Sequence, residues 1–127
     1  MELYELSMTE VSEKIRTKEV SPVEVTQSSL ARLEEVEPTL TAFVTTTPEL
    51  ALEQAKLAEK EIGDGNYRGP LHGIPLAVKD LYDTAGVRTT SSSAQRADHV
   101  PDTDSVSVAK LYAAGMVLIG KTHTHEF

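Results

Sequence analysis

Most of the information about the architecture lies in one segment, Leu71-His72-Gly73-Ile74-Pro75-Leu76-Ala77-Val78-Lys79-Asp80. It is apolar from Ile74 to Val78 and then becomes charged at Lys79. A second short apolar run, Met116-Val117-Leu118-Ile119, follows directly after Gly115. Short runs that are apolar on both faces are typical of strands buried in a parallel sheet. We therefore predict a strand in each run.

A helix is expected between these two strands. Asp102-Thr103-Asp104 offers N-cap residues, Gly115 ends the helix, and its apolar side carries Val108, Leu111 and Tyr112. A strand, a crossover helix and a parallel strand form the βαβ unit, which is almost always right-handed. We therefore predict the α/β class, with residues 63–127 forming the start of a mixed, largely parallel sheet.

Residues 1–62 are predicted to form a helical arm. Ser7-Met8-Thr9-Glu10 has the pattern of a capping box, and Ser21-Pro22-Val23-Glu24 starts a second helix with proline where its missing N–H costs nothing. That helix is expected to end near Glu37, because Pro38 disfavours the α conformation in the residue before it. β-Branched residues then predict a short strand at about 39–47.

A third helix is expected to begin at Thr47-Pro48-Glu49 and to end with Gly63 in the C′ position. Its apolar face would consist of Ala51, Ala55, Ala58 and Ile62. The charged residues of the arm are most simply the solvated faces of these helices. No chemistry is therefore expected from residues 1–62.

The charge is distributed unevenly along the 127 residues. The formal net charge is −8, and residues 1–64 carry all of it, with fourteen acidic and six basic residues against six of each in the remainder. Such a surface does not neutralise phosphates, and aromatic residues for base stacking make up only 5% of the chain. We expect no direct contact with nucleic acid.

Cysteine is absent, which excludes disulfide scaffolds, thiolate nucleophiles and cysteine-bound metal centres. No apolar run approaches the roughly 20 residues that span a bilayer. The N-terminus, Met1-Glu2-Leu3-Tyr4-Glu5, lacks the basic flank of a signal peptide. We therefore expect a cytoplasmic protein without a membrane partner.

The segment Gly115-Met116-Val117-Leu118-Ile119-Gly120-Lys121-Thr122 matches the phosphate-binding pattern G-x-x-x-x-G-K-[ST] in every letter. A P-loop needs a strand before its first glycine and a helix after it. Here a predicted helix precedes Gly115, bulky apolar residues fill the loop, and only five residues follow Thr122. The sequence therefore argues against ATP or GTP binding.

His123 and His125 follow a predicted buried strand, and alternation places both imidazoles on one face. Such a pair could share a metal ion, and an H-x-H at a strand end resembles the metal motif of the amidohydrolase superfamily. A mononuclear catalytic site usually has three protein ligands, and the spacing of His72 and His99 implicates neither. Two loop histidines are the simpler interpretation, so we expect neither a metal nor a cofactor.

Lys79 ends a predicted buried strand, at the edge of the sheet where ligands gather in open α/β folds. A desolvated lysine loses its preference for the charged form and can act as a base. Position alone favours the simpler alternative, a lysine that extends into solvent. Ser91-Ser92-Ser93 could supply a nucleophile, although three serines in a polar stretch more often form only a loop.

Residues 69–80, G-P-L-H-G-I-P-L-A-V-K-D, resemble the lysine-bearing motif of the amidase signature family. The similarity extends to residues 84–90 and 109–120, and residues 120–127 resemble the family's G-K-T-N-x-x-E-F. The N-terminal helices are also similar to the opening of the family. The resemblance implies that the chain is the N-terminal segment of a larger amidase-signature domain.

Family members hydrolyse amides with a Ser–Ser–Lys triad, in which one serine attacks the carbonyl, a second serine in a cis peptide relays the proton, and the lysine is the final base. The resemblance implies that Lys79 is that lysine. It also implies cleavage of a linear amide to a carboxylate plus ammonia or an amine, through an acyl-serine intermediate and without a cofactor.

Two departures from the family pattern limit this assignment. His123 stands where the family has asparagine. Both catalytic serines of the family lie downstream, in a segment that this sequence does not contain, so Ser91, Ser92 and Ser93 are not assigned. We expect the 127 residues to be a piece of a longer enzyme and to be inactive alone.

Two alternatives remain open. Within the family, the A subunit of the aspartyl/glutamyl-tRNA amidotransferase passes ammonia to a partner subunit. The chain could also be a non-catalytic fragment or association module that folds through uncovered sheet edges and apolar helix faces. The expected partners are a small-molecule amide and either a second copy, in a homodimer, or whatever associates with the exposed sheet edges.

Overall fold

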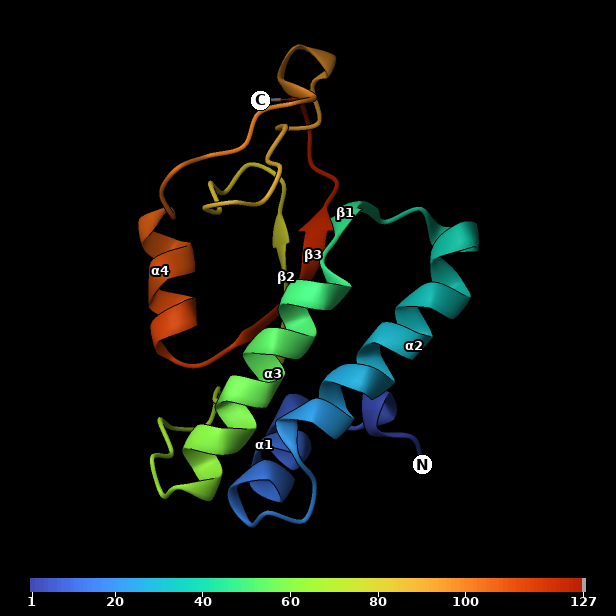
Figure 1. The fold of residues 1–127 in the computed structure, drawn as a ribbon. Helices are drawn as coiled ribbons and strands as arrows, with labels where there is room; N and C mark the ends of the chain where they lie inside the picture. Colours follow the sequence, from blue (N-terminus) through green and yellow to red (C-terminus); the bar gives the residue numbers. More distant parts are fainter. Residues whose placement is uncertain (127) are drawn as a thin grey trace.

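The computed structural model describes residues 1–126 and shows helices packed around a small sheet (Figure 1). The helices and strands are η1 (Leu3–Glu5), α1 (Met8–Arg16), α2 (Pro22–Leu40), β1 (Phe43–Thr46), α3 (Pro48–Gly63), β2 (Pro75–Lys79), η2 (Ala94–Arg96), α4 (Val106–Ala113) and β3 (Val117–Thr122). None of the helices within these residues is both long and apolar enough to cross a membrane.

The sheet has the strand order β1-β3-β2. The central strand, β3, pairs in parallel with β2 and antiparallel with β1. β2 begins at Pro75, and a proline is tolerated at the first residue of a strand because no ladder bond is lost there. The predicted α/β class and the mixed sheet are confirmed, and β2, α4 and β3 follow one another as expected.

The pairing of β2 with β3 shifts by one residue at Ile119. Beside this bulge, backbone groups of Leu118 and Ile119 are bound by Gln54 of α3 and by Thr47, the residue before the helix. The carbonyl of Ile119 accepts a hydrogen bond from the Thr47 amide (2.9 Å), and the carbonyl of Leu118 accepts one from the Thr47 hydroxyl (2.8 Å). The Leu118 amide donates to the side-chain oxygen of Gln54 (2.8 Å). The first half of α3 therefore completes the hydrogen bonding of the central strand.

The apolar faces predicted for the helices are largely confirmed. The four residues predicted for the apolar face of α3 are all buried. In α1, Val11 and Ile15 are buried, whereas Met8 is 55% exposed. The capping box of α1 is present, with the Glu10 amide donating to the Ser7 hydroxyl. The periodicity of the sequence thus identified the buried side of the arm.

The predicted end of the second helix at Glu37 is wrong. α2 continues through Pro38 to Leu40. The ring removes one intrahelical hydrogen bond, but this turn is exposed and its free carbonyl can bind water. The Glu37 carboxylate also accepts hydrogen bonds from the amides of Ala42 and Phe43, which closes the helix onto β1.

Two further helix boundaries differ from the prediction. α4 is capped by Ser105, whose hydroxyl accepts the Val108 amide, because the Asp104 carboxylate instead accepts the amide of Ala85. α3 includes Gly63 as its last helical residue, and the positive φ of the turn, 90°, falls on Gly65. β1 lies within the strand predicted at about 39–47.

Candidate active site

Lys79 is the last residue of β2, and its side chain is exposed. The side chains of Ala77 and Lys79 are exposed, whereas the intervening Val78 is buried with residues of α3 and α4. Because successive side chains of a strand point to opposite faces, Lys79 points away from these helices. The structure thus places Lys79 at the carboxyl end of a parallel strand, where ligands bind in open α/β sheets.

The backbone on both sides of Lys79 is held by hydrogen bonds. The carbonyl of Lys79 accepts from the Tyr82 amide (3.1 Å). The Asp80 amide donates to the carbonyl of Thr122 at the end of β3 (2.9 Å), and the Asp80 carbonyl accepts from the Ser91 amide (2.8 Å). The peptide between Lys79 and Asp80 is therefore anchored to the neighbouring strand and to two loop segments.

The Asp80 carboxylate is completely buried. Its Oδ2 accepts hydrogen bonds from the amide of Thr90 (3.0 Å) and from the Thr90 hydroxyl. Its Oδ1 has no hydrogen-bond donor in the described part of the chain, but Nζ of Lys121 lies 3.8 Å away. That distance is typical of an ion pair and too long for a hydrogen bond. Since a buried carboxylate is costly unless it is paired, Lys121 supplies its electrostatic compensation.

Lys121, in β3, is fully buried despite its charge. Its Nζ donates to the carbonyl of Tyr82 (2.9 Å) and to the hydroxyl of Thr89 (2.7 Å). Burial lowers the pKa of Lys121 below its ordinary value, and the negative charges of Asp80 and Asp83 oppose that change. In the sequence analysis Lys121 appeared only within the excluded P-loop pattern and within the motif at residues 120–127, and neither gave it a role. Its place in a strand that is apolar on both faces was the available signal that it would be buried.

The serines at 91–93 lie in a loop, as predicted. Ser91 and Ser92 have positive φ angles of 54° and 53°. The Ser92 hydroxyl accepts a hydrogen bond from the backbone just after β3 (3.1 Å), and the Ser93 hydroxyl donates to the Glu126 carboxylate (2.9 Å). No hydrogen bond joins the three serine side chains to Lys79 within the described residues. The side chains of Ser92 and Ser93 tie the loop to the segment that follows β3.

The two histidines after β3, His123 and His125, are exposed. Residues 1–126 contain no group of three or more histidine or carboxylate side chains that could hold a metal ion. The metal-dependent alternative therefore gains no third ligand from the described part of the chain.

The segment that matches a P-loop forms the strand β3 and the turn before it. Gly115 has a φ of 90°, and a Cβ there would lie 2.9 Å from Cγ of His72. A Cβ on Gly120 would lie 2.6 Å from the Phe43 ring and 2.7 Å from the carbonyl oxygen of Thr45. Both glycines are thus required by close packing, which accounts for the pattern without a nucleotide.

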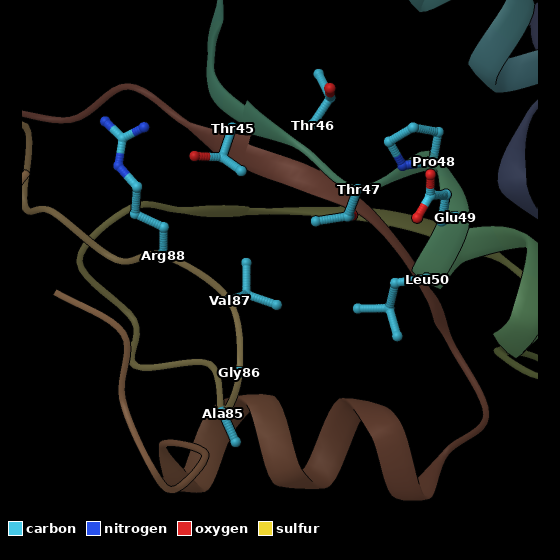
Figure 2. A pocket seen from close by; sticks show the side chains of 10 residues that line it. All are labelled: Thr45, Thr46, Thr47, Pro48, Glu49, Leu50, Ala85, Gly86, Val87 and Arg88. Atoms are coloured by element: carbon cyan, nitrogen blue, oxygen red, sulfur yellow. The ribbon is translucent and has the colours of Figure 1, made fainter. Parts of the chain in front are cut away.

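A pocket of about 710 Å³ lies between the start of α3 and the loop at 85–88 (Figure 2). Its lining consists of Thr45, Thr46, Thr47, Pro48, Glu49, Leu50, Ala85, Gly86, Val87 and Arg88. Lys79 is not part of this lining, so the pocket and the candidate catalytic lysine are separate features of the surface.

The chain belongs to the amidase family, whose model, Amidase, matches residues 24–127. The chain is 47% identical over all 127 residues to the A subunit of glutamyl-tRNA(Gln) amidotransferase from Carboxydothermus hydrogenoformans, and 49% identical to the protein of the same name from Geotalea daltonii. It spans 26% of the length of each of these two curated relatives.

Solved structures of amidases share the fold. The peptide amidase of Stenotrophomonas maltophilia superposes with a TM-score of 0.89 at 34% identity, over 96% of this chain and 25% of that chain. An amidase family protein from Bacillus anthracis gives 0.88 at 28% identity, over 98% of this chain and 25% of that chain. The predicted family and fold class are confirmed.

Proposed function

We propose that this chain forms the N-terminal part of the A subunit of a tRNA-dependent amidotransferase, an amidase-family protein that releases ammonia from a linear amide. The observation that carries the proposal is the identity of 47% and 49%, over all 127 residues, to two proteins of that name. The identity to the solved amidases of S. maltophilia and B. anthracis is lower, at 34% and 28%. A free-standing amidase, the function expected first from the motifs, is the second candidate.

Lys79 is the proposed base of this reaction. Its exposed side chain at the end of β2 can be reached by a substrate and by groups from the rest of the protein, while its backbone is anchored. Its amine would accept, through a relay serine, the proton of the serine that attacks the amide carbonyl. Return of that proton to the leaving nitrogen releases ammonia, and water then hydrolyses the acyl-serine. Both serines are proposed to belong to the part of the protein that this chain does not cover.

The proposal predicts a protein partner. The relatives are named as one subunit of an amidotransferase, and a protein that releases ammonia in such a complex must deliver it to the acceptor held by another polypeptide. We accordingly propose that a second, different polypeptide is the principal partner, in preference to a second copy of this chain.

The test is to sequence the gene beyond the codon of Phe127 and to express the whole open reading frame. We expect a downstream serine- and glycine-rich segment and ammonia release from a simple linear amide such as glutamine. Lys79→Ala should lower kcat by at least about 1000-fold, as loss of an essential base does. Lys56→Ala, at an exposed position of α3, is the matched control and should leave kcat unchanged.

The outcomes separate the candidates. A stop codon directly after Phe127, or full activity in Lys79→Ala, would overturn the proposal. Ammonia release that rises when partner subunits and glutamyl-tRNA are added supports the amidotransferase, whereas release that is indifferent to them supports the free-standing amidase.

A further inference from the structure

We propose that Lys121 is a positioning residue for Lys79. Its buried ammonium group links β3 to the turn at Tyr82 and to the loop at 89–91, the three segments that fix the Lys79–Asp80 peptide. It so sets the direction in which the Lys79 side chain leaves the sheet. This inference rests on the proposed role of Lys79 as the base.

Lys121 contacts residues that bind the backbone on both sides of the Lys79–Asp80 peptide. Nζ of Lys121 donates to the Tyr82 carbonyl (2.9 Å), and the Tyr82 amide donates to the Lys79 carbonyl (3.1 Å). The same Nζ lies 3.8 Å from Oδ1 of Asp80, the residue that follows Lys79. The buried ammonium of Lys121 thus contacts Tyr82, whose amide binds the Lys79 carbonyl, and Asp80, the residue on the other side of the same peptide.

Besides β3 and the turn at Tyr82, the third segment that holds the Lys79–Asp80 peptide is the loop at 89–91. Nζ of Lys121 donates to the Thr89 hydroxyl (2.7 Å). The next two residues of this loop bind Asp80, since the Thr90 amide and hydroxyl donate to its Oδ2 and the Ser91 amide donates to its carbonyl. Loss of Lys121 would therefore loosen a loop that holds the backbone of Asp80 in place.

Stability alone is a weak explanation for this buried pair. Both Asp80 and Lys121 are 0% exposed, so both charges are removed from water. Replacing a buried ion pair by apolar residues of similar volume is often neutral or stabilising, whereas a buried pair can specify one arrangement of the chain. The register of β2 against β3 agrees with a positioning role for Lys121, because it places Lys121 beside Val78, the residue before Lys79.

The charges around Lys121 limit how it can be altered. Asp80 and Asp83 act on it, and burial opposes its charge. Lys121→Met alone would leave the Asp80 carboxylate buried without its partner, which can prevent folding. The double variant Asp80→Asn/Lys121→Met removes both charges together. Thr89→Val is a milder change that removes one hydrogen-bond acceptor of Lys121 at nearly constant volume.

The first measurement is native-state hydrogen exchange, read by mass spectrometry, on the protein expressed from the whole open reading frame. In Thr89→Val and in the double variant, the amides of Asp80, Thr90 and Ser91 should exchange at least about 10-fold faster than in the wild type. The amide of Leu118, in the same strand as Lys121 but bound to Gln54, is the internal control and should keep its rate. Unchanged exchange at the first three amides, or an equal increase at all four, would overturn the proposal.

The second measurement is a KM-against-kcat split in the enzyme expressed from the whole open reading frame. A misplaced base should lower kcat by about 10-fold in Thr89→Val and about 100-fold in the double variant, with KM within about twofold of the wild type. Thr26→Val, a buried threonine of α2, is the matched control with unchanged kcat. A variant that loses only folded protein would show an unchanged kcat per folded molecule and would overturn the proposal.

Failure of this inference is distinguishable from failure of the proposed function. If Lys79→Ala is inactive while both network variants keep full kcat, the positioning role is wrong and the proposed function stands. If the wild-type enzyme releases no ammonia, the proposed function is wrong. Localised faster exchange then still supports the structural role of Lys121, and unchanged exchange overturns it.

Discussion

Nε2 of His72 lies 3.2 Å from Oε1 of Glu61 in a contact that joins the last turn of α3 to the segment before β2. The His72 side chain is fully buried, and its Nδ1 accepts a hydrogen bond from the Arg68 amide (3.0 Å). With Nδ1 occupied as an acceptor, the ring proton lies on Nε2 and is donated to the carboxylate. The helical arm is thus fastened to the loop that leads to Lys79.

This contact predicts a dependence of stability on pH. The hydrogen bond from the Arg68 side chain, together with His72, holds the pKa of Glu61 below its ordinary value of 4.5. A lowered carboxyl pKa in the folded state stabilises the protein above about pH 4.5, and that contribution is lost as the pH falls through the lowered value. Urea unfolding followed by circular dichroism should therefore show the wild type and Glu61→Gln converging below pH 4.5.

The matched control is Glu59→Gln, at an exposed position of the same helix. Its difference from the wild type should stay constant across the same pH range. If the free energy of unfolding of Glu61→Gln differs from that of the wild type by the same amount at every pH, the ion pair between Glu61 and Arg68 is contradicted.

Gly115 is predicted to tolerate no side chain. Its φ of 90° disfavours any residue with a Cβ, and a Cβ there would overlap the ring of His72. Gly65 has the same φ of 90° but no atom within 4 Å of an added Cβ. Gly65→Ala should cost about 1 kcal/mol from backbone strain alone. Gly115→Ala should cost at least about 2 kcal/mol more because packed atoms must move. Equal losses in urea unfolding would refute the clash with His72.

Gln54 is predicted to stabilise the bulge in β3. Its side-chain oxygen is the acceptor of the Leu118 amide (2.8 Å), and Leu118 is completely buried. Gln54→Met removes the acceptor at similar volume and leaves a buried N–H unpaired, which costs about 1–3 kcal/mol. Gln54→Glu keeps an acceptor oxygen and should cost less when unfolding is measured at pH 7. The reverse order of the two variants would show that volume or charge decides at this position.

Local periodicity predicted the parts of the fold that depend on one segment at a time. The spacing of Ala51, Ala55 and Ala58 identified the buried face of α3, and the short apolar run at residues 74–78 predicted the strand β2. These patterns predict burial because a helix or strand repeats its geometry, so that the residues on its buried side recur at a fixed spacing in the sequence.

Contacts between distant segments could not be predicted in this way. Asp104 was expected to help cap α4, but its carboxylate binds the amide of Ala85, 19 residues earlier. Lys121 and Asp80 are 41 positions apart in the sequence, and nothing in the local pattern of either shows that their charges meet inside the protein. The ion pair depends on the register of β2 against β3, which neither strand specifies alone.

Thr26 provides the last prediction, because its hydroxyl lacks a hydrogen-bond partner in the described structure. The residue is 0% exposed in α2, and its Oγ1 meets neither a donor nor an acceptor within residues 1–126. Thr90 is also buried, but its hydroxyl donates to Asp80 and accepts the Ser92 amide (3.1 Å). Threonine and valine have nearly the same shape, so replacement by valine isolates the contribution of each hydroxyl.

Removal of an unpaired buried hydroxyl relieves its desolvation cost, so Thr26→Val should stabilise the protein by about 1 kcal/mol. The same change at Thr90 leaves the Asp80 carboxylate short of a donor and should destabilise it by about 1–3 kcal/mol. The two free energies of unfolding, measured with urea under identical conditions, are thus expected to change in opposite directions. A loss of stability in Thr26→Val would mean that the hydroxyl is paired after all, and the buried water or backbone group that pairs it would then be part of the packing of α2.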